Sequence, residues 1–499
     1  MATIVSLLQV VLSGHSITVV LICFVAFLVS LTVAAKFSAH GRRNTPPGPP
    51  GWPVLGNLPS LTKDIHLQLT KWRYQYGDVF SVRFGLQDAV IVNGSEAIKE
   101  ALVQKANHFS NRPDYYLVRC VNMHFGAVFC LYGDRWSALR RFTVSTLRFF
   151  GMGTTILEEK IQEECRHFCS ALRLLVGQPV DLKNRLETSV SNIIVYMAVG
   201  KRFEYGDPKF GRLQILAERI NVTFYKLYIV NCFPMLRFFP GFRKMYNELM
   251  DRTAELYSYI REYIGQHGNT APDDIRDFID AFNKTKQDNP GFLPDMTLTY
   301  LIADLFSAGT ETSSLTLCWG FLYLTAYPDV QEKVQAELDR VVGRDRPPAF
   351  SDRINLPYTE ATIMEIQRIA TIIPLLPHRT SDDTTLLGYD IPAGTNVIVN
   401  LWDLHMDPSR WPDPHRFDPA RFLGENGRLL THDAFMPFST GYRRCWGEQM
   451  GKMELFLFLT NTLQQFTLKL PEGTEPDFHG ISTAFIYPRP FSLIVTKRE

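Results

Sequence analysis

The segment from Thr297 to Tyr327 is apolar on every side of a helix and stops at Pro328, which cannot continue one. Such a helix is about 45 Å long, at roughly 1.5 Å per residue. A helix that is apolar all round lies either inside a large protein or in a membrane. Asp304 and Glu311 argue against a membrane span, because charged side chains are expensive in the hydrocarbon core. The segment therefore predicts a long central helix inside a large body.

The rest of the chain predicts a body that contains mostly helices and a few strands. Its 499 residues, 45% of them hydrophobic, provide a sizeable core, and 52 Lys and Arg balance 51 Asp and Glu, so no nucleic-acid partner is indicated. Helical periodicity runs from residue 95 to about residue 370. Strands are predicted at Val79–Phe84, Ala89–Val92, Thr384–Leu387 and Asn396–Leu401, and the last two flank a turn in GYDIPAGT. The fold class is mainly α with small β-sheets.

The N-terminus carries a separate apolar segment. Residues 17–35 contain no charge, are about long enough to cross a bilayer core of roughly 30 Å, and are followed at once by Lys36, Arg42 and Arg43. A cleaved signal peptide would have its basic residues before the apolar run, and a mitochondrial presequence would be amphipathic and rich in Arg. Basic residues after the run favour a single signal anchor with the body in the cytosol. The predicted organisation is an anchor at 1–36, a basic and proline-rich hinge at 37–57 and one domain at 58–499.

The centre of the long helix is unusual because it contains Ala308-Gly309-Thr310-Glu311-Thr312. Glycine in mid-helix costs about 1 kcal/mol relative to alanine, and a buried carboxylate needs a partner. A satisfied core threonine is the structural interpretation of Thr312. The functional interpretation is an opening in the helix that holds a small polar ligand and a proton relay.

A second unusual segment lies near the C-terminus, just before an amphipathic helix that runs to about Gln465. Cys445 lies at the N-terminus of this helix beside Arg443 and Arg444, and the helix dipole and the cations are expected to stabilise its thiolate. Such a thiolate is either a nucleophile or a metal ligand. The fixed positions of the segment are Phe438, Gly441, Arg443, Cys445 and Gly447.

The pattern FxxGxRxCxG resembles the haem-binding signature of the cytochromes P450. The run FMPFSTGYRRCWGEQMGKMELFLFLTNTLQQF is similar to the animal microsomal family 2, and the resemblance covers essentially the whole chain, including the anchor. It implies the cytochrome P450 fold and a haem b whose iron is bound by the Cys445 thiolate, which favours O–O cleavage.

Further segments match the family pattern in the order that it requires. Glu365 and Arg368 form an ExxR element, and spacing of three on a helix allows a bidentate ion pair. The resemblance implies a third partner, an arginine of a PERF-like element, which is assigned to Arg416 in Pro414-His415-Arg416-Phe417. These residues are expected to have a structural role behind the haem.

The haem propionates need cationic or hydrogen-bonding partners in a partly buried site. Arg112 is one of the partners named below, and the alternative interpretation is that it is an ordinary surface arginine. The partners that the resemblance implies are Trp136, Arg140, Arg112, His378 and Arg443.

The resemblance also gives a role to the weakened helix centre. It implies that Thr312 hydrogen-bonds iron-bound oxygen and, with Glu311, supplies the protons for O–O cleavage. The predicted activity is that of a monooxygenase. One alternative is a haem-thiolate isomerase or dehydratase that uses no dioxygen, and another is a non-catalytic haem or sterol sensor. The acid–alcohol pair argues against both.

The substrate pocket is expected above the haem and is mostly apolar, which predicts a small lipophilic substrate such as a steroid, a fatty acid or a xenobiotic. Asp304 either meets a polar group of the substrate or caps a buried network. Residues 232–245 interleave aromatic and basic side chains and form either a packed interhelical loop or a loop that dips into membrane lipids. The predicted pocket residues are Asp304, Phe306, Ala308, Ile372, Leu376 and Phe485.

Electrons are expected from outside the chain, because no Rossmann or flavin motif follows the haem segment. The resemblance implies NADPH-cytochrome P450 reductase as the donor, cytochrome b5 as a further candidate, and the endoplasmic reticulum membrane as the location. A basic face is expected to receive the acidic partner, with surface solvation as the alternative. Its members are Arg135, Arg141, Arg444 and Lys452.

Overall fold

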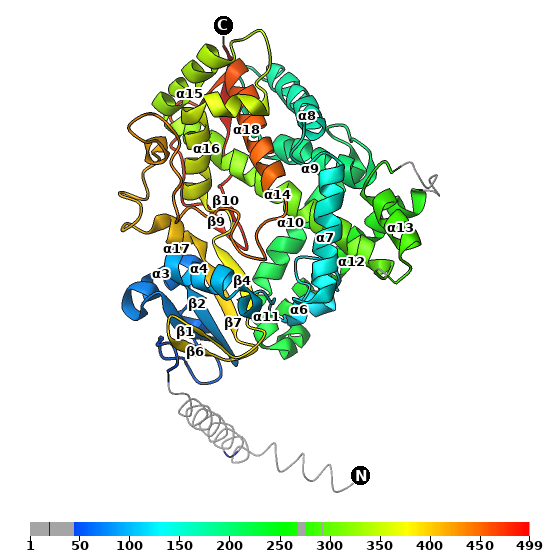
Figure 1. The fold of residues 1–499 in the computed structure, drawn as a ribbon, viewed down its shortest axis with the longest axis vertical. Helices are drawn as coiled ribbons and strands as arrows, with labels where there is room; N and C mark the ends of the chain where they lie inside the picture. The colour runs from blue at the N-terminus through cyan, green and yellow to red at the C-terminus, as the bar shows by residue number, and fades with distance from the viewer. Residues whose placement is uncertain (1–18, 20–43, 268–274, 292, 499) are drawn as a thin grey trace.

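The computed structural model of the chain describes residue 19 and residues 44–267, 275–291 and 293–498, and it is mainly helical with small sheets, as predicted (Figure 1). The helices are α3 (Ile65–Tyr76), α4 (Ser95–Lys99), α5 (Ala106–Phe109), α6 (Tyr116–Cys120), α7 (Asp134–Phe149), α8 (Thr155–Arg173), α9 (Lys183–Val199), α10 (Pro208–Lys226), α11 (Tyr228–Cys232), α12 (Pro240–Gln266), α13 (Phe278–Asp288), α14 (Met296–Ala326), α15 (Pro328–Val341), α16 (Pro357–Ala370), α17 (Leu401–Met406) and α18 (Glu448–Gln465). Short helical turns are η1 (Leu58–Ser60), η2 (Glu100–Gln104), η3 (Met123–Phe125), η4 (Pro234–Phe238), η5 (Phe350–Asn355) and η6 (Pro419–Phe422).

The predicted central helix is α14, which crosses the middle of the molecule (Figure 1). Its N-terminal half, including Leu298, packs into one hydrophobic core, and its C-terminal half, including Phe321, packs into another. Gly309 allows the close approach of α9, because a Cβ at this position would lie 2.3 Å from Cδ1 of Ile194. Packing between helices thus explains the glycine that weakens the helix centre.

The strands form four small sheets. The largest has the order β1-β2-β7-β4, in which only the β2–β7 pair is parallel, and it lies with α3 and α4 at the end of the molecule opposite α8 and α15 (Figure 1). The others have the orders β3-β11-β8, β10-β9 and β5-β6. The strands are β1 (Val79–Phe84), β2 (Gln87–Val92), β3 (Pro179–Val180), β4 (Leu375–Arg379), β5 (Thr384–Leu386), β6 (Tyr389–Ile391), β7 (Asn396–Asn400), β8 (Phe466–Lys469), β9 (Ile481–Ser482), β10 (Ile486–Tyr487) and β11 (Leu493–Lys497).

All four predicted strands are present, with ends that differ by no more than two residues. The prediction of a turn in GYDIPAGT is confirmed at both ends of the segment, at Gly388 and at Ala393-Gly394, but the residues between them, Tyr389–Ile391, form β6 and pair with β5. Gly388, in the left-handed region with φ of 82°, supplies the tight connection between these two strands.

The start of the described body is fastened to β1. The backbone N–H of Ser81 donates to Pro47 O at 2.7 Å, and the Asn57 side chain donates to Pro49 O and Pro50 O. The predicted anchor at 1–36, apart from residue 19, and the hinge up to residue 43 lie outside the described residues. Among the residues that are described, no helix is both long enough and apolar enough to cross a bilayer.

The segment 232–245 is not an extended loop. It contains the end of α11, the short helix η4 and the start of α12 at Pro240, because Pro234 and Pro240 each begin a helical turn. Met235, Phe238 and Phe239 are nevertheless exposed, so an apolar surface remains at this place.

Candidate active site

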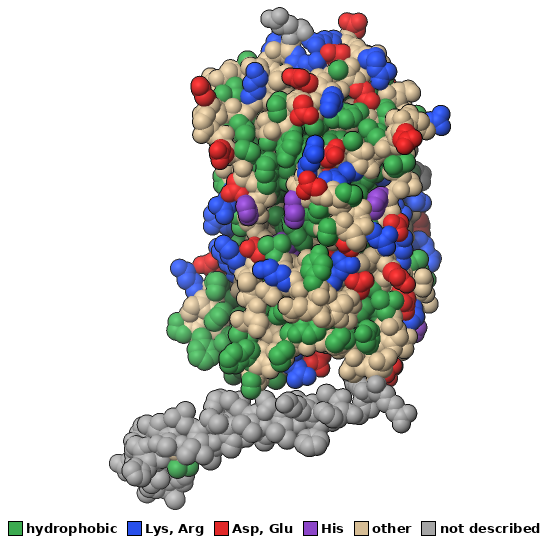
Figure 2. Space-filling model, turned by 90° about the vertical axis from the view of Figure 1, so that its left-hand side faces the viewer, with side chains coloured by type: hydrophobic (Ala, Val, Ile, Leu, Met, Phe, Trp, Pro, Cys, Tyr) green, Lys and Arg blue, Asp and Glu red, His purple; other side chains and the backbone are tan. Residues whose placement is uncertain are grey.

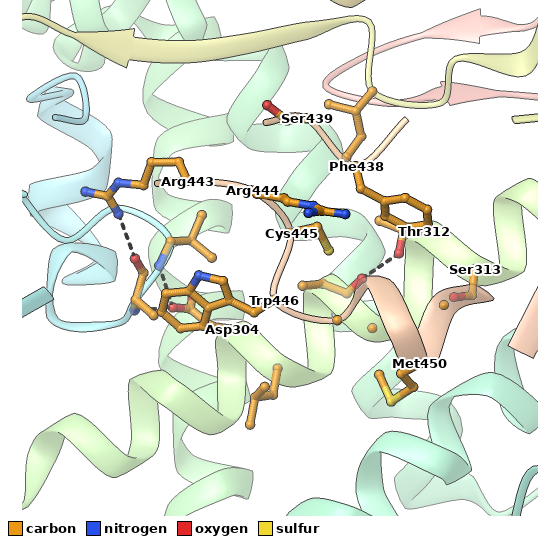
Figure 3. A pocket seen from close by; sticks show the side chains of 18 of the residues that line it. Asp304, Thr312, Ser313, Phe438, Ser439, Arg443, Arg444, Cys445, Trp446 and Met450 are labelled. Atoms are coloured by element: carbon orange, nitrogen blue, oxygen red, sulfur yellow. Dashed lines mark hydrogen bonds between the residues drawn. The ribbon is translucent and has the colours of Figure 1, made fainter. Parts of the chain in front are cut away.

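A cavity between α14 and the loop before α18 brings together most of the predicted site residues (Figure 3). Cys445 lies on the loop side, and Ala308 and Thr312 lie on the facing side of α14. The cavity is also lined by residues of α7, α9 and β4, so segments that are far apart in the sequence meet around one space.

The loop that carries Cys445 is held by its own backbone. The N–H of Cys445 donates to Phe438 O at 3.0 Å, and α18 begins three residues later. Gly441 has a φ of 74°, and a Cβ there would lie 1.8 Å from Leu102 O. The signature glycine therefore packs the loop against η2, and Phe438 and Gly447 line the cavity itself.

Replacing Gly441 with alanine is expected to displace this loop. The positive φ and the clash with the Leu102 carbonyl together should lower the free energy of unfolding by more than about 1 kcal/mol. Chemical denaturation of the two proteins measures this difference. Gly427 is a suitable control, because it also has a positive φ, but a Cβ there would meet nothing within 4 Å. An equal loss in both variants would contradict the role of the close approach.

The expectation that Arg444 stabilises the Cys445 thiolate is confirmed in direction, because its charge lowers the pKa of the Cys445 thiol, whereas the contacts of Arg443 are with other groups. Arg443 donates to Ser110 O at 2.8 Å and to Cys130 O at 2.6 Å, and Arg444 forms an ion pair of 2.5 Å with Glu448. Burial raises the pKa of the Cys445 thiol to about 11, although its residue is exposed towards the cavity, because the surrounding protein desolvates the sulfur. A bound metal cation is the group that would hold this sulfur as a thiolate.

The wall of the cavity near α7 fits a group that carries carboxylates. The indole Nε1 of Trp136 is buried without a hydrogen-bond partner among the described residues. Burial lowers the pKa of Arg112 to about 10 and that of Arg443 to about 9, and no carboxylate among the described residues forms an ion pair with either guanidinium group. His378 also lines this wall. A flat ligand with two carboxylates, such as haem, matches this set of donors.

Arg140 does not line the cavity, contrary to the prediction of direct contact. Its guanidinium lies 5.4 Å from the ring centroid of Trp136 and donates a hydrogen bond to Tyr442 O. Arg140 therefore supports Trp136 and the cysteine loop from behind.

Thr312 and Glu311 point to different surroundings. Thr312 lines the cavity, and its hydroxyl donates to Ala308 O at 2.8 Å, whereas Glu311 is buried outside the cavity lining. The Glu311 carboxylate accepts hydrogen bonds from the Tyr487 hydroxyl and the Asn221 amide. Burial raises the pKa of Glu311 to about 7, and these two donors oppose the shift.

Four of the six predicted pocket residues line the cavity. They are Asp304, Ala308, Ile372 and Leu376. Phe306 was predicted wrongly, because its ring is buried on another side of α14 near Phe210, and Leu305 lines the cavity in its place. Phe485 is also absent from the lining, and its ring lies against that of Tyr487, with 6.2 Å between the ring centroids.

The Asp304 carboxylate caps a buried network. It accepts the backbone N–H of Ala127 at 2.6 Å and that of Val128 at 3.0 Å (Figure 3). Burial raises the pKa of Asp304 to about 7. The side chain thus ties the loop before α7 to α14, and its hydrogen-bonding capacity is already largely used.

The ExxR pair forms as predicted, but its third partner is different. Glu365 and Arg368 are fully buried and joined at 2.7 and 2.8 Å, and Arg368 also donates to His405 O. The arginine that approaches Glu365, at 3.3 Å, is Arg421 of η6, whereas Arg416 is exposed. The assignment of Arg416 was therefore wrong, and the PERF-like element is Pro419-Ala420-Arg421-Phe422.

Sequence reasoning missed Glu454, a fully buried carboxyl group that lines the same cavity. It accepts a hydrogen bond of 2.5 Å from Ser313, and its Oε1 has no partner among the described residues. Burial raises its pKa to about 8. A lone acidic residue in the apolar run MELFLFL was the signal that could have found it.

Replacing Glu454 with glutamine is expected to change how stability depends on pH. Between about pH 4.5 and 8 the folded protein keeps the Glu454 proton and the unfolded chain loses it, so the free energy of unfolding falls as the pH rises. Glutamine is neutral and similar in shape, and the variant should lose this part of the decline. Denaturation at pH 5 and pH 8 measures it, and an unchanged slope would contradict the raised pKa.

Comparisons with known proteins agree with this geometry. The family model described as "Cytochrome P450" matches residues 46–494. Cytochrome P450 2U1 of Bos taurus is 36% identical over 491 residues, covering 92% of this chain and 90% of that protein. Cytochrome P450 2J2 of Homo sapiens is 39% identical, covering 90% of each chain, and cytochrome P450 2B4 of Oryctolagus cuniculus is 39% identical, covering 91% of this chain and 94% of its own length.

Proposed function

Because this chain belongs to the cytochrome P450 family and is thus a haem-thiolate monooxygenase, we propose that it inserts one oxygen atom of dioxygen into a lipophilic substrate beside Cys445. The observation that supports this most directly is that Cys445 and Thr312 line the same cavity from opposite sides. A thiolate ligand on one side and a hydroxyl group on the other leave room between them for a flat cofactor and a bound substrate.

The donor set of the cavity suits haem b. Cys445 would ligate the iron, and Arg112, Trp136, His378 and Arg443 would hold the propionates. When bound, haem supplies an iron centre that binds and activates dioxygen. The backbone hydrogen bond from Cys445 to Phe438 O holds the loop that carries the sulfur, and the Thr312 hydroxyl could donate to a polar ligand in the same cavity.

We assign proton supply to Thr312 and Glu311. Thr312 lines the cavity, and Glu311 is the residue directly before it in the chain. The pKa of Glu311, about 7, allows its carboxyl group to gain and lose a proton near neutral pH. Its carboxyl group has to leave Tyr487 and Asn221, or pass its proton through water, to serve Thr312.

The substrate class follows from the lining of the cavity. Apolar side chains such as Leu301, Leu305, Ile372 and Leu376 surround the space above Thr312, and Asp304 is already bonded to the backbone. A steroid, a fatty acid or an apolar xenobiotic fits this lining, because burial of apolar surface supplies the binding energy.

We further propose that electrons come from NADPH through cytochrome P450 reductase, with cytochrome b5 as a second donor. Arg141 is exposed on α7, and Arg135 is half-buried on the same helix. Arg444 and Lys452 both pair with Glu448, at 2.5 and 2.9 Å, which lowers the net charge of that part of the face. Arg141 is therefore the stronger candidate for contact with an acidic partner, because Arg135 already donates a hydrogen bond to Phe125 O at 2.8 Å.

The proposed location is the endoplasmic reticulum membrane, with residues 1–36 as a single anchor, 37–57 as a hinge and the domain 58–499 in the cytosol. Hydrophobic side chains gather at the lower edge of the body in Figure 2. The exposed apolar residues of this end include Trp52, Leu55, Leu86 and Phe238. A patch of this kind beside an anchor suits contact with lipid.

The proposal is tested by supplying the haem-loaded protein with reductase, NADPH and labelled dioxygen, using lauric acid, testosterone and ethoxycoumarin as probes. We expect label in the product of at least one probe.

Replacing Thr312 with alanine should lower the amount of product formed per NADPH by about a hundredfold, the usual loss when a general acid–base group is removed. The variant should release peroxide instead. Thr325→Ala is the matched control, because Thr325 also lies on α14 and donates to a backbone carbonyl, that of Leu322, but does not line the cavity. Rearranged or dehydrated products without label would favour an isomerase or dehydratase, and haem binding without NADPH use would favour a sensor.

A further inference from the structure

Glu311 faces a group of polar side chains that runs from α14 to the surface of the molecule. The group, called here the Glu311 cluster, joins four elements that are far apart in the sequence. Its members are Lys183 and Glu187 of α9, Glu218 and Asn221 of α10, Glu311 of α14 and Tyr487 of β10.

The contacts in the Glu311 cluster form two linked sets. On the inner side, Tyr487 and Asn221 each donate a hydrogen bond to one oxygen of Glu311. On the outer side, the Lys183 ammonium lies 2.6 Å from Glu218 and 3.6 Å from Glu187. The Lys183 ammonium also lies 5.7 Å from the ring centroid of Tyr487, so the two sets adjoin.

Exposure to solvent decreases along the cluster towards the cavity. The side chains of Glu218 and Lys183 are 36% and 32% exposed, Glu187 is 13% exposed, and Glu311 is 5% exposed. The exposed fraction of these titratable side chains therefore falls from the surface to the residue that precedes Thr312 in the chain.

The charges of the cluster are not balanced, because three carboxylates share a single ammonium group. Burial, with a smaller contribution from the charge of Glu218, raises the pKa of Glu187 and that of Glu311 to about 7. One further titratable group near Glu187 is the thiol of Cys318. The charges of Glu187 and of Asp181 both act on this thiol. The cluster therefore holds exchangeable protons near neutral pH.

We propose that Lys183, Glu187 and Glu218 form the route by which protons from solvent reach Glu311, and that Tyr487 and Asn221 are positioning residues that keep Glu311 at the inner end of this route. The inference rests on the proposed role of Glu311 as a proton donor.

Each oxygen insertion consumes one dioxygen, two electrons and two protons and yields one hydroxylated product and one water. Each proton that Glu311 gives up is replaced by one that enters at Glu218 and moves inward, so every carboxylate returns to its starting state.

Turnover with dioxygen and turnover with hydrogen peroxide separate this role from a structural one. Hydrogen peroxide already contains the two electrons and two protons, so a reaction that it drives needs no net supply of protons from solvent through the cluster. We expect the doubly substituted variant E187Q/E218Q to form about tenfold less product per NADPH with dioxygen, a smaller loss than removal of the general acid itself. The solvent deuterium isotope effect should rise, and peroxide-driven turnover should be unchanged. The probe is whichever of lauric acid, testosterone and ethoxycoumarin the wild type oxidises fastest.

Glu255→Gln provides a matched control, because Glu255 forms an exposed ion pair of 2.7 Å with Arg212 between α12 and α10 and lies outside the cluster. It should behave as wild type. Unchanged turnover in E187Q/E218Q would overturn the proposal, and so would an equal fall in both reactions, which indicates structural damage. Glu311→Gln separates the two claims. If it leaves coupling intact, Glu311 is not the donor. If it uncouples turnover while E187Q/E218Q does not, Glu311 is the donor and the entry route is wrong.

Discussion

Replacement of Cys445 with alanine is expected to abolish monooxygenase activity and to remove the thiolate-type Soret band from the spectrum of the reduced, carbon-monoxide-bound protein. Among the described cysteines, Cys445 is the one that lines the cavity shared with Thr312. Cys130 lies near the cavity, where its backbone carbonyl accepts a hydrogen bond from Arg443. Without this sulfur, no other thiol among the described residues that line the cavity could ligate the iron.

The control for this substitution is Cys120→Ala on α6, which removes a half-buried thiol that does not line the cavity. It should keep the thiolate-type spectrum. Cys445→His adds a positive test, because it should give a haem protein with a histidine-type spectrum. A thiolate-type band that survives in Cys445→Ala would show that another cysteine ligates the iron.

Replacement of Arg368 with alanine is expected to destabilise the fold by about 3–5 kcal/mol, the usual cost of removing one partner from a fully buried ion pair. Glu365 would remain buried at 0% exposure, and its oxygen that pairs with Arg368 Nε would lose this partner. The carbonyl of His405 would also lose its guanidinium donor. Denaturant unfolding and the fraction of purified protein that retains haem measure the effect.

Two further arginine variants test the corrected assignment of the third partner. Arg421→Ala should cost stability, because Arg421 also donates to the backbone of Pro412 and Asp413. Arg416→Ala should change the free energy of unfolding by less than about 0.5 kcal/mol, as expected for an exposed residue. Equal losses in these two variants would contradict the geometry described for η6.

The local sequence predicted those features that local chemistry determines. Pro328 and the apolar run fixed the bounds of α14 to within one residue, and the spacing of Glu365 and Arg368 placed them on one face of α16. The cysteine signature placed Cys445 just before α18. Each of these depends on residues close together in the chain.

Features that depend on tertiary packing were predicted less well. Arg416 and Arg421 both stand one residue before a buried phenylalanine and two after a proline, so the pattern alone does not distinguish them. The structure does, because the N–H of Asp418 binds Glu365 and turns η6 towards it. Phe306 was similarly misplaced, since an all-apolar helix gives no sign of which face meets the cavity.

The polar partners of buried acids were the least predictable part of the site. Glu311 was recognised from its neighbours in the chain, but Tyr487 and Asn221 lie more than 80 residues away on either side. Glu454 and Ser313 are 141 residues apart. Only the folded arrangement shows where these carboxyl groups find their hydrogen bonds.

The two buried guanidinium groups of Arg112 and Arg443 link the supply of cofactor to the amount of folded protein. Burial disfavours their charge, as their lowered pKa values show, and a dianionic ligand beside them would relieve this cost only in the native state. A ligand that binds the native state alone stabilises it in proportion to the logarithm of its free concentration. Cells short of haem should therefore accumulate less of this protein, because a larger fraction of the newly made chain remains open to proteolysis.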